Sequence, residues 1–348
     1  MKRNILKFIC GIGLVCALWS CENGNQKFDD YEGGTTVYFP YQYPVRTIVL
    51  GDDEYDLTLD HAHKCQIMAT FGGSYNGSDG SVQVAVDESL VNNLTFADGS
   101  PVKAMPSAYY NLSTTSLDFK GTMNGKTDVQ LTDAFFADPE AVKNTYVIPL
   151  LITGQSGFSR ILTGSLLNEN EPGSRCNSEL WDVKPMDYVL YCVKFQNKYS
   201  GWWLSNGSTS TANIEKAQAY EIRTKSLTSC LYTVSYQGKW WQTNKETNEL
   251  EEIDSIFTAD IQLDFNGSEQ CVISSPSNLY TAAGSGSWGD NTEIKAWGNK
   301  DRDGMELNYT VDFGLDEKGL PHLFSTHEKM IWQRSGVKIE EFAPIYVK

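Results

Sequence analysis

Alternating apolar and polar residues occupy most of the chain after residue 35. The runs in the first half include "RTIVLG", "GSVQVAVD" and "TYVIPLLITG", and those in the second half include "DYVLYCVKF", "CLYTVSYQG" and "EKMIWQRS". Because successive side chains of a strand point to opposite faces, this pattern predicts β-strands. Helical signals are confined to short pieces such as "ADPEAVKN", where Asp138 would cap a helix that begins at Pro139. The predicted fold class is all-β.

A polar stretch without periodicity divides the chain at residues 168–183, and we interpret it as a linker. Before it, the short strands of residues 35–167 predict an antiparallel β-sandwich. After it, residues 184–348 contain successive hairpins, which we expect to turn at Asn266-Gly267 and near Asp303-Gly304. Consecutive hairpins form an up-and-down meander, and such a meander closes most readily into an antiparallel β-barrel.

The first residues have the pattern of a targeting segment. Residues 1–20 read as a signal peptide, with a basic start and an apolar run from Phe8 to Trp19 that is too short to span a bilayer. The sequence "LWSC" resembles a bacterial lipobox, so Cys21 would be lipidated, and the alternative is an ordinary secretory signal followed by a chance cysteine. Residues 21–34 would form an acidic tether. Acidic residues after a lipidated cysteine resemble the surface-export signal of Bacteroidota lipoproteins, which favours the exterior face of the outer membrane over the periplasmic face.

Charge and cysteine content narrow the partners further. The 348 residues carry a formal net charge of −16 at pH 7, which argues against a duplex nucleic-acid partner. We expect contact with the membrane only through the lipid anchor. Five cysteines follow Cys21, and no two of them have the C-x-x-C spacing. An exported protein could form one disulfide in its second half, and burial as small apolar residues would explain the same cysteines.

The stretch "LDHAHKCQIMAT" raises the question of a metal site. On an unbroken strand His61, His63 and Cys65 would share one face, as zinc or copper ligands would. The same face would also carry five apolar residues between Leu57 and Phe71, which marks it as the side that faces the core. A buried neutral histidine fits that side better than a metal ligand, although a bulge near His63 would change the phase of the strand. We therefore predict no metal here.

Other chemical motifs are incomplete. The stretch "NKDRDG" has the start of a calcium loop, but Thr310 occupies the position where a bidentate Glu is needed, and a hairpin turn explains the stretch equally well. The Asp-x-x-Asp-x-Asp-x-Glu motif of family-18 glycoside hydrolases is broken in "DAFFADPE" and "DSIFTADIQLD". No G-x-S-x-G elbow and no Walker loop occur. We predict no catalytic residues, no cofactor and no enzyme activity, although the 44 acidic residues leave open a carboxylate pair formed in space.

Tryptophan is concentrated in the second half, where eight of the nine lie between Trp181 and Trp332. Two pairs are adjacent, and neighbours on a strand face opposite sides, so one member can fill a core while the other lies elsewhere. Exposed indole rings can stack on sugar rings, and tryptophan is also a common core residue. The candidate ligand-binding residues are Trp202, Trp203, Trp240, Trp241, Trp288 and Trp297.

Four long stretches resemble known families. "RTIVLGDDEYDLTLDHAHKCQIMATFGG" and "QLTDAFFADPEAVKNTYVIPLLIT" resemble an Ig-like N-terminal domain of unknown function in Bacteroidota surface lipoproteins, which also precedes family-18 glycoside hydrolase modules. "DYVLYCVKFQNKYSGWWLSNG" and "AWGNKDRDGMELNYTVDF" resemble a second uncharacterised domain, associated with a lipocalin-like barrel. The resemblance implies a role in polysaccharide utilisation beside an outer-membrane glycan importer, and it supplies no ligand residues.

These observations together favour a cell-surface lipoprotein that binds an oligo- or polysaccharide without catalysis. One alternative is a lipocalin-like barrel that holds a lipid or another apolar ligand in a cavity. A second alternative is a structural accessory of an outer-membrane importer. Glycoside hydrolase activity is less favoured, because the family-18 motif is broken.

Overall fold

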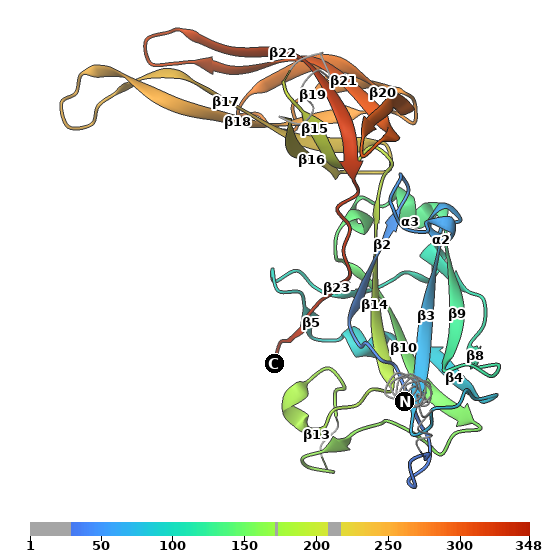
Figure 1. The fold of residues 1–348 in the computed structure, drawn as a ribbon. Coiled ribbons are helices and arrows are strands. Elements are labelled where there is room, and N and C mark those ends of the chain that lie inside the picture. Colours follow the sequence, from blue (N-terminus) through green and yellow to red (C-terminus); the bar gives the residue numbers. More distant parts are fainter. Residues whose placement is uncertain (1–28, 171–172, 208–216) are drawn as a thin grey trace, which may run out of the picture.

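Two β structures follow one another in the computed structural model, which describes residues 29–170, 173–207 and 217–348. The predicted signal peptide and Cys21 lie outside the described residues. Figure 1 shows a sandwich that contains the N-terminal half and a barrel at one end of it, from which long hairpins extend sideways. The predicted all-β class, with a sandwich followed by a barrel, is confirmed.

The first sheet of the sandwich has five strands among the described residues. In spatial order they are β11 (Arg160–Ile161), β1 (Thr36–Tyr38), β3 (Lys64–Gly72), β9 (Asn124–Leu131) and β7 (Tyr110–Leu112). Strand β1 pairs with β3 only from Thr70 to Gly72, whereas β9 pairs with β3 from Lys64 to Thr70. Residues 64–69 of β3 therefore have a described strand partner on one side only.

The second sheet includes a strand that the sequence had assigned to the barrel domain. In spatial order its strands are β23 (Glu340–Glu341), β2 (Pro44–Val49), β14 (Tyr188–Gln196), β10 (Tyr146–Ser156), β4 (Ser81–Val86) and β8 (Ser116–Asp118), and β6 (Lys103–Ala104) also pairs with β10. Strand β14 lies between β2 and β10, parallel to the first and antiparallel to the second. The sandwich thus continues past the expected boundary at residue 184, because the apolar run of β14 fills the centre of this sheet.

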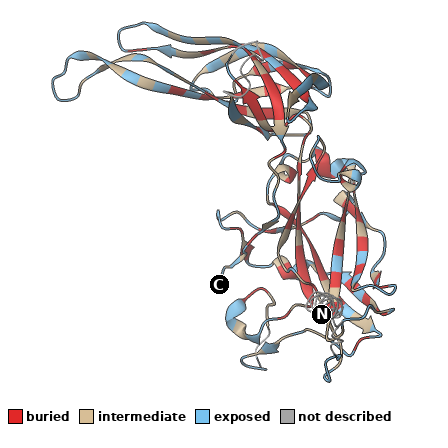
Figure 2. Ribbon diagram, viewed as in Figure 1, coloured by how far each residue is buried: buried red, intermediate tan, exposed pale blue. Residues whose placement is uncertain are grey.

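Alternate residues of the strands meet between the two sheets. In β3, Cys65, Ile67, Ala69 and Phe71 are buried while Met68 is exposed, as the alternation predicts. Figure 2 shows that buried positions recur along the strands of both sheets. A second apolar cluster lies on the outer side of β14 and β10, where Phe342, from the segment after β23, packs.

The strand predicted from residue 57 onward begins later than expected. Residues 58–61 form the short helix α2 (Thr58–His61), and His63 has a left-handed backbone with φ of 56° before β3 begins. The prediction that the histidines face the core was wrong: His61 is exposed, and His63 is half-buried with its ring 4.3 Å from that of Phe136. The helix breaks the phase that would have placed both histidines beside Cys65.

The remaining elements of the first half are short. They are α3 (Asp133–Ala137), η1 (Glu88–Val91), η2 (Ser107–Tyr109), η3 (Pro139–Val142) and η4 (Ser178–Leu180), with the two-stranded pairs β12 (Ser165–Leu166) to β13 (Trp181–Val183) and β24 (Ile345–Tyr346) to β5 (Leu94–Thr95). The helix start at Pro139 is confirmed, since the Asp138 side chain accepts a hydrogen bond from the Glu140 N–H. No helix among the described residues has the length and apolarity needed to cross a membrane.

The second half forms the predicted meander, and it closes. The eight described strands of the barrel are β15 (Gly201–Ser205), β16 (Gln218–Thr224), β17 (Ser229–Thr243), β18 (Leu250–Asp264), β19 (Gln270–Ser274), β20 (Thr281–Trp297), β21 (Lys300–Leu315) and β22 (Pro321–Arg334). Each strand pairs with the next in the chain, and β22 pairs back with β15. The turn at Asn266-Gly267 is confirmed, as both residues have positive φ. The turn expected near Asp303-Gly304 lies instead at Gly298-Asn299, because Trp297 pairs with Lys300.

Side chains fill the interior of the barrel. Its core includes the fully buried Trp203, and the buried carboxylate of Glu328, which is 4% exposed, lies there as well. The Glu328 carboxylate accepts hydrogen bonds from the hydroxyls of Ser205 (2.5 Å), Tyr232 (3.2 Å) and Tyr309 (3.2 Å). Three hydroxyl donors thus compensate for the desolvation of a buried carboxylate.

Two hairpins extend beyond the closed part of the barrel. Strand β17 pairs with β18 from Ser229 to Thr243, although β16 accompanies it only from Cys230 to Tyr232. The extended parts of β17–β18 and β21–β22, which we call the arms, contact each other through aromatic rings. The Tyr236 ring stacks on Phe257 of its own hairpin at 4.8 Å and on Phe324 of the other at 5.0 Å. The arms therefore share a narrow aromatic core.

The cysteines do not form the disulfide considered from the sequence. Cys65, Cys176, Cys192, Cys230 and Cys271 are all buried free thiols. Burial raises the pKa of Cys65, Cys192 and Cys271 to about 12 in each case. These thiols are therefore un-ionised at neutral pH and pack as small apolar side chains.

Candidate ligand-binding pocket

One flank of the sandwich is open between the two sheets. Strand β2 pairs with β14 along Val45–Val49, but β23 covers its other edge only at Pro44 and Val45. Residues 64–69 of β3, in the opposite sheet, also lack a described strand partner on one side. The two incomplete edges border the same space, and a pocket of about 590 Å³ lies there. Ligand pockets in proteins have volumes of about 300–1,000 Å³.

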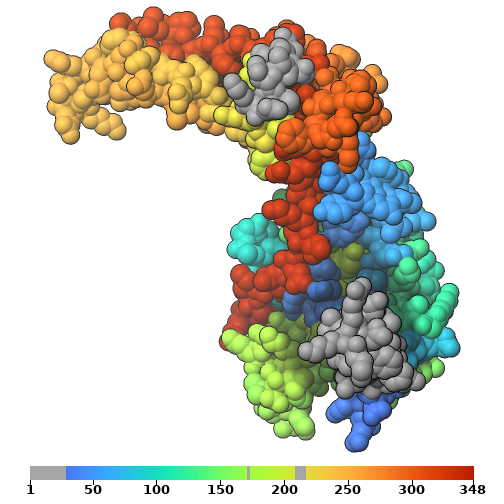
Figure 3. Space-filling model, viewed as in Figure 1, coloured from blue at the N-terminus to red at the C-terminus, as the bar shows by residue number. Residues whose placement is uncertain are grey.

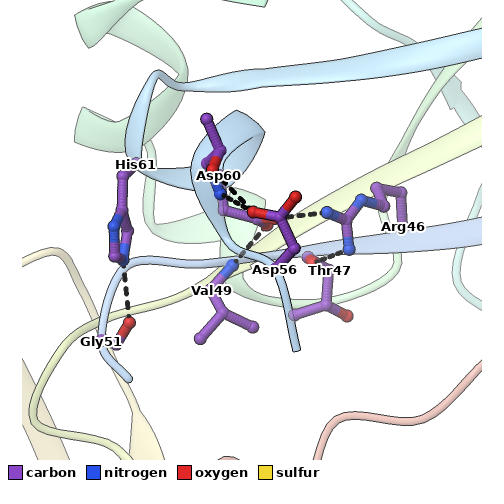
Figure 4. Close-up of polar contacts among 8 residues, drawn as sticks. Arg46, Thr47, Val49, Gly51, Asp56, Asp60 and His61 are labelled. Atoms are coloured by element: carbon purple, nitrogen blue, oxygen red, sulfur yellow. Dashed lines mark hydrogen bonds and ion pairs between the residues drawn. The ribbon is translucent and has the colours of Figure 1, made fainter. Parts of the chain in front are cut away.

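A buried aspartate satisfies the exposed edge of β2 (Figure 4). Helix α2 places Asp60 so that it is 0% exposed, and its Oδ1 accepts a hydrogen bond from the Val49 N–H at 2.9 Å. Its Oδ2 accepts a hydrogen bond from Nη2 of Arg46, and Nη1 of Arg46 donates to the Thr47 carbonyl at 3.0 Å. The ion pair therefore occupies backbone groups that an additional strand would otherwise pair with. It also holds the guanidinium in one position on the wall of the pocket.

The loop that carries α2 is held by further polar contacts. The His61 Nε2–H donates to the Gly51 carbonyl at 3.0 Å, which ties the helix to the residues after β2. The Asp56 carboxylate accepts hydrogen bonds from the Thr58 N–H at 3.0 Å and from its hydroxyl at 2.6 Å. These two bonds hold the pKa of Asp56 below its usual value. Asp56 is therefore ionised at neutral pH, at the edge of the pocket.

The inner wall of the pocket is apolar, and its rim is aromatic and exposed. Val45, Val49, Ile67 and Val189 line it and are at most 8% exposed. At the rim, Tyr41 is 62% exposed and Tyr55 is 76% exposed, each from a loop next to β2. Met68 and Ile339 are also exposed there. Two tyrosine side chains thus present accessible surface at the entrance to an apolar pocket.

The segment that follows the barrel forms one wall. Strand β22 ends at Arg334, and Val337, Lys338 and Ile339 then line the pocket before β23 pairs with β2. We call residues 335–339 the strap. Figure 3 shows the C-terminal segment descending from the barrel over the sandwich. The Ser335 hydroxyl donates a hydrogen bond to Asp53, so the strap is fastened to the loop after β2.

The six tryptophans proposed from the sequence do not gather at this pocket. Trp203 is 0% exposed and Trp288 is 8% exposed, so both belong to the core of the barrel. The Lys198 ammonium lies 4.3 Å from the Trp288 ring. Trp202 is half-buried, with the Arg334 guanidinium 5.1 Å from its ring.

The other three tryptophans are half-buried on the long hairpins. The Trp240 ring lies 4.7 Å from that of His322 in the opposite arm. The Lys318 ammonium lies 3.6 Å from the Trp241 ring. Trp297 precedes the turn between β20 and β21, and no two of the six indole rings contact each other in the described structure. The binding role of all six stays a prediction.

The structure also places the two motifs considered for metal. In "NKDRDG", the carboxylates of Asp301 and Asp303 each accept a backbone N–H across the β20–β21 hairpin, from Lys295 and Asn291 respectively. One group of metal-ligating side chains lies close together among the described residues, namely Asp52, Asp290 and Asp303, and it includes neither histidine from the first motif. Burial, with the charges of Asp52 and Asp290, raises the pKa of Asp303 to about 6.

Sequence reasoning missed the residues of the pocket. Tyr41 stands in "FPYQYP", between two prolines and two other aromatics, and Tyr55 stands in "DDEYDL", among acidic residues. An aromatic residue in a polar loop was the available signal, since loops lie at the surface. No sequence signal joins these loops to Ile339, which is nearly 300 positions away. The pocket exists only because β23 returns to β2.

Comparison with known proteins identifies relatives of both halves. Residues 30–159 match a family described as an N-terminal domain, and residues 198–336 match "Domain of unknown function (DUF5627)". A crystal structure of a Bacteroides ovatus protein of unknown function is 31% identical, covers 92% of this chain and 100% of its own, and has a TM-score of 0.76. The chain belongs to the family of that protein. The family therefore combines the sandwich and the barrel in one chain, as described above.

Two further structures share little with this family. A Bacteroides ovatus multidomain protein that includes DUF1735 is 10% identical, with 86% of this chain and 92% of its own covered and a TM-score of 0.38. A Bacteroides ovatus ATCC 8483 protein, provisionally named a carbohydrate-binding protein, is 14% identical, with coverages of 89% and 99% and a TM-score of 0.26. Neither similarity is strong enough to carry an argument. A search of curated proteins found no match.

Proposed function

We propose that this protein is a non-catalytic glycan-binding lipoprotein, anchored to the outer membrane through Cys21 and exposed at the cell surface. The observation that carries the proposal is the pocket between β2 and β3, which is lined by two exposed tyrosines and by a guanidinium fixed in place by Asp60. The lipobox-like sequence supports the anchor, and the membership in a Bacteroides family is compatible with this location. An outer-membrane glycan importer is the partner that the sequence resemblance suggests.

The pocket suits a sugar for a physical reason. A pyranose ring has an apolar C–H face, which can pack on an aromatic ring, and hydroxyls around its edge, which need hydrogen-bond partners. Tyr41 and Tyr55 supply the aromatic surface, with a hydroxyl on each. The Arg46 guanidinium has five N–H donors, and its position is set by Asp60 and Thr47 before any ligand arrives. Such preorganisation reduces the entropy lost on binding.

Calorimetric titration with a panel of soluble polysaccharides and oligosaccharides tests the proposal. We expect one class of glycan to bind, and we expect Tyr41→Ala and Tyr55→Ala each to weaken that binding at least about tenfold. Tyr31→Ala is a matched control, because Tyr31 is 63% exposed and lies outside the pocket lining. Folded protein that binds no glycan of a broad panel would contradict the proposal, as would binding that neither pocket substitution weakens.

A second function is favoured by the apolar inner wall. Val45, Val49, Ile67 and Val189 would suit an acyl chain or another apolar ligand. The alternative of an apolar ligand, which the sequence placed in the barrel, therefore has a better location in the sandwich, since the described barrel interior is packed with side chains. Native mass spectrometry of the purified protein distinguishes the two functions: a co-purified lipid would support this one, and a clean apoprotein that binds sugar would contradict it.

A further inference from the structure

The charged groups around the pocket are unevenly compensated. Five of its lining residues are ionisable acids or bases: Arg46, Lys338, Asp53, Asp56 and Asp60. The Arg46 charge is matched by Asp60, which is fully buried against it. Two carboxylates and one exposed lysine then remain, so the pocket carries a net negative charge. The whole chain, with a formal charge of −16, adds a field of the same sign.

The two remaining carboxylates are held in place by the protein. Asp53 accepts hydrogen bonds from the Ser335 hydroxyl of the strap and from the Glu54 N–H, the latter at 2.6 Å. Asp56 is oriented by its two hydrogen bonds from Thr58. Lys338, by contrast, is exposed, and its ammonium can move away into solvent. The negative charges are therefore fixed beside the ligand space, while the positive charge is not.

We propose that this pocket selects uncharged glycans and rejects glycans that carry carboxylates or sulfates, with Asp53 and Asp56 as the specificity-determining residues. The inference rests on the proposed glycan-binding function and narrows it to a class of sugar. An acidic sugar seated between Tyr41 and Tyr55 would bring its charge close to two carboxylates. Like charges placed together in a binding site are a strong means of excluding a ligand. Arg46 does not offset them, because Asp60 already neutralises it.

Pairs of polysaccharides that differ only in oxidation at C6 test the inference. Suitable pairs are β-1,4-glucan with β-1,4-polyglucuronate and β-1,4-mannan with β-1,4-polymannuronate, each titrated as soluble oligosaccharides into the full-length protein. We expect the neutral member of one pair to bind at least about tenfold more tightly than its oxidised counterpart. Equal or tighter binding of the oxidised member would overturn the inference while leaving the proposed function intact. Failure of both members of every pair to bind would instead contradict the proposed function.

A double substitution assigns the effect to the two aspartates. Asp53→Asn with Asp56→Asn removes both charges and keeps one oxygen acceptor at each position, so we expect it to reduce the discrimination about tenfold by strengthening the acidic ligand. Asp87→Asn with Asp98→Asn is a matched control, since each of these aspartates also accepts bonds from a serine two residues later, away from the pocket. Discrimination that survives the first double substitution, or is lost in the second, would overturn the assignment.

The unsubstituted protein offers an independent measurement, should the double variant fold poorly. Raising the ionic strength from about 0.01 M to about 1 M shortens the screening length from about 30 Å to about 3 Å. We expect this change to strengthen binding of the oxidised ligand and to leave the neutral ligand nearly unaffected. Discrimination that is independent of salt would mean that shape rather than charge excludes acidic sugars, and it would overturn the inference.

Discussion

Asp303 provides a quantitative test of the electrostatics at the junction between sandwich and barrel. It is 4% exposed on β21, and its carboxylate lies with those of Asp52, from the loop after β2, and Asp290, from β20, within 4.8 Å of one another. The cations of the same region, Lys300 and Arg302, face Glu54 instead. One backbone N–H, from Asn291, donates to Asp303 at 2.9 Å. The charge of Asp303 is therefore poorly compensated.

The size of the expected effect follows from the pKa. Burial first, and then the charges of Asp52 and Asp290, raise the pKa of Asp303 from 3.8 to about 6. A change of about two pKa units corresponds to about 3 kcal/mol between the protonated and ionised states. Because the pKa is raised in the folded protein, the stability contributed by this group is fully present below about pH 4 and is lost as the pH rises through about 6. We expect Asp303→Asn, which has no charge to bury, to increase the free energy of unfolding at pH 7 by up to about 3 kcal/mol.

Urea unfolding at a series of pH values measures this effect. Tryptophan fluorescence reports mainly on the barrel and its junction, because eight of the nine tryptophans lie between residues 181 and 332. The parent should lose stability at this site as the pH rises from 4 to 6. We expect Asp303→Asn to lack this loss. Asp301→Asn is the matched control: it lies on the same strand and accepts a similar backbone bond, but it is exposed. If Asp303→Asn is less stable than the parent at pH 7, the ionised carboxylate stabilises the junction and the reasoning is refuted.

Four further substitutions test the fold and the pocket by chemical denaturation. Asp60→Ala leaves the Arg46 guanidinium without its partner and the edge of β2 without an acceptor, so we expect a loss of about 3 kcal/mol, and a loss below 1 kcal/mol would show that the ion pair is dispensable. Glu328→Ala removes the shared acceptor of three hydroxyls in the barrel and should cost about 3 kcal/mol, whereas unchanged stability would mean that these hydroxyls find water or each other. Trp203→Ala empties a fully buried site and should cost about 3–5 kcal/mol, while Trp297→Ala should cost less than about 1 kcal/mol; similar losses for both would contradict their different burial.

The barrel was predictable because its strands are consecutive. Alternation identifies each strand, short turns make neighbours pair, and a meander of eight strands has few other ways to remove its edges. The register was less predictable. Asp303-Gly304 and Gly298-Asn299 both have turn chemistry, and the choice between them depends on Trp297 pairing with Lys300 across the hairpin. That pairing is a property of two strands together, which the local pattern does not contain.

The helix α2 shows how alternation can mislead over a short span. Residues 57–63 alternate in a way that fits a strand, yet Asp56 and Thr58 form the local side-chain bond that starts a turn. The helix that follows delivers Asp60 to the edge of β2, where it meets two donors. Local alternation alone predicts a longer strand, whereas the contact between Asp60 and Val49 favours the helix. The prediction that His61 and His63 share a strand face with Cys65 was therefore wrong, because β3 begins only at Lys64.

The location of β14 and of the strap explains why the pocket could not be predicted. Apolar patterning identifies Tyr188–Gln196 as a strand, but it does not indicate that β2, more than 130 positions earlier, is its parallel neighbour. The strap and β23 reach β2 only after the chain has passed through all the strands of the barrel. Pairing across such separations is decided by the assembled sheets and not by any local run of residues.

The pocket depends on both halves of the chain. Its inner wall comes from β2, β3 and β14, whereas one side of it is the continuation of β22, fastened by Ser335 to Asp53. A chain that ended at Gln196 would keep the central strands of the sandwich but would lose the strap and β23, which leaves the edge of β2 open from Pro44 onward. The barrel alone would have no part of the inner wall. Both halves of this chain therefore contribute to the proposed binding pocket, and a glycan-binding activity that the isolated sandwich retained in full would show that the strap is not part of the site.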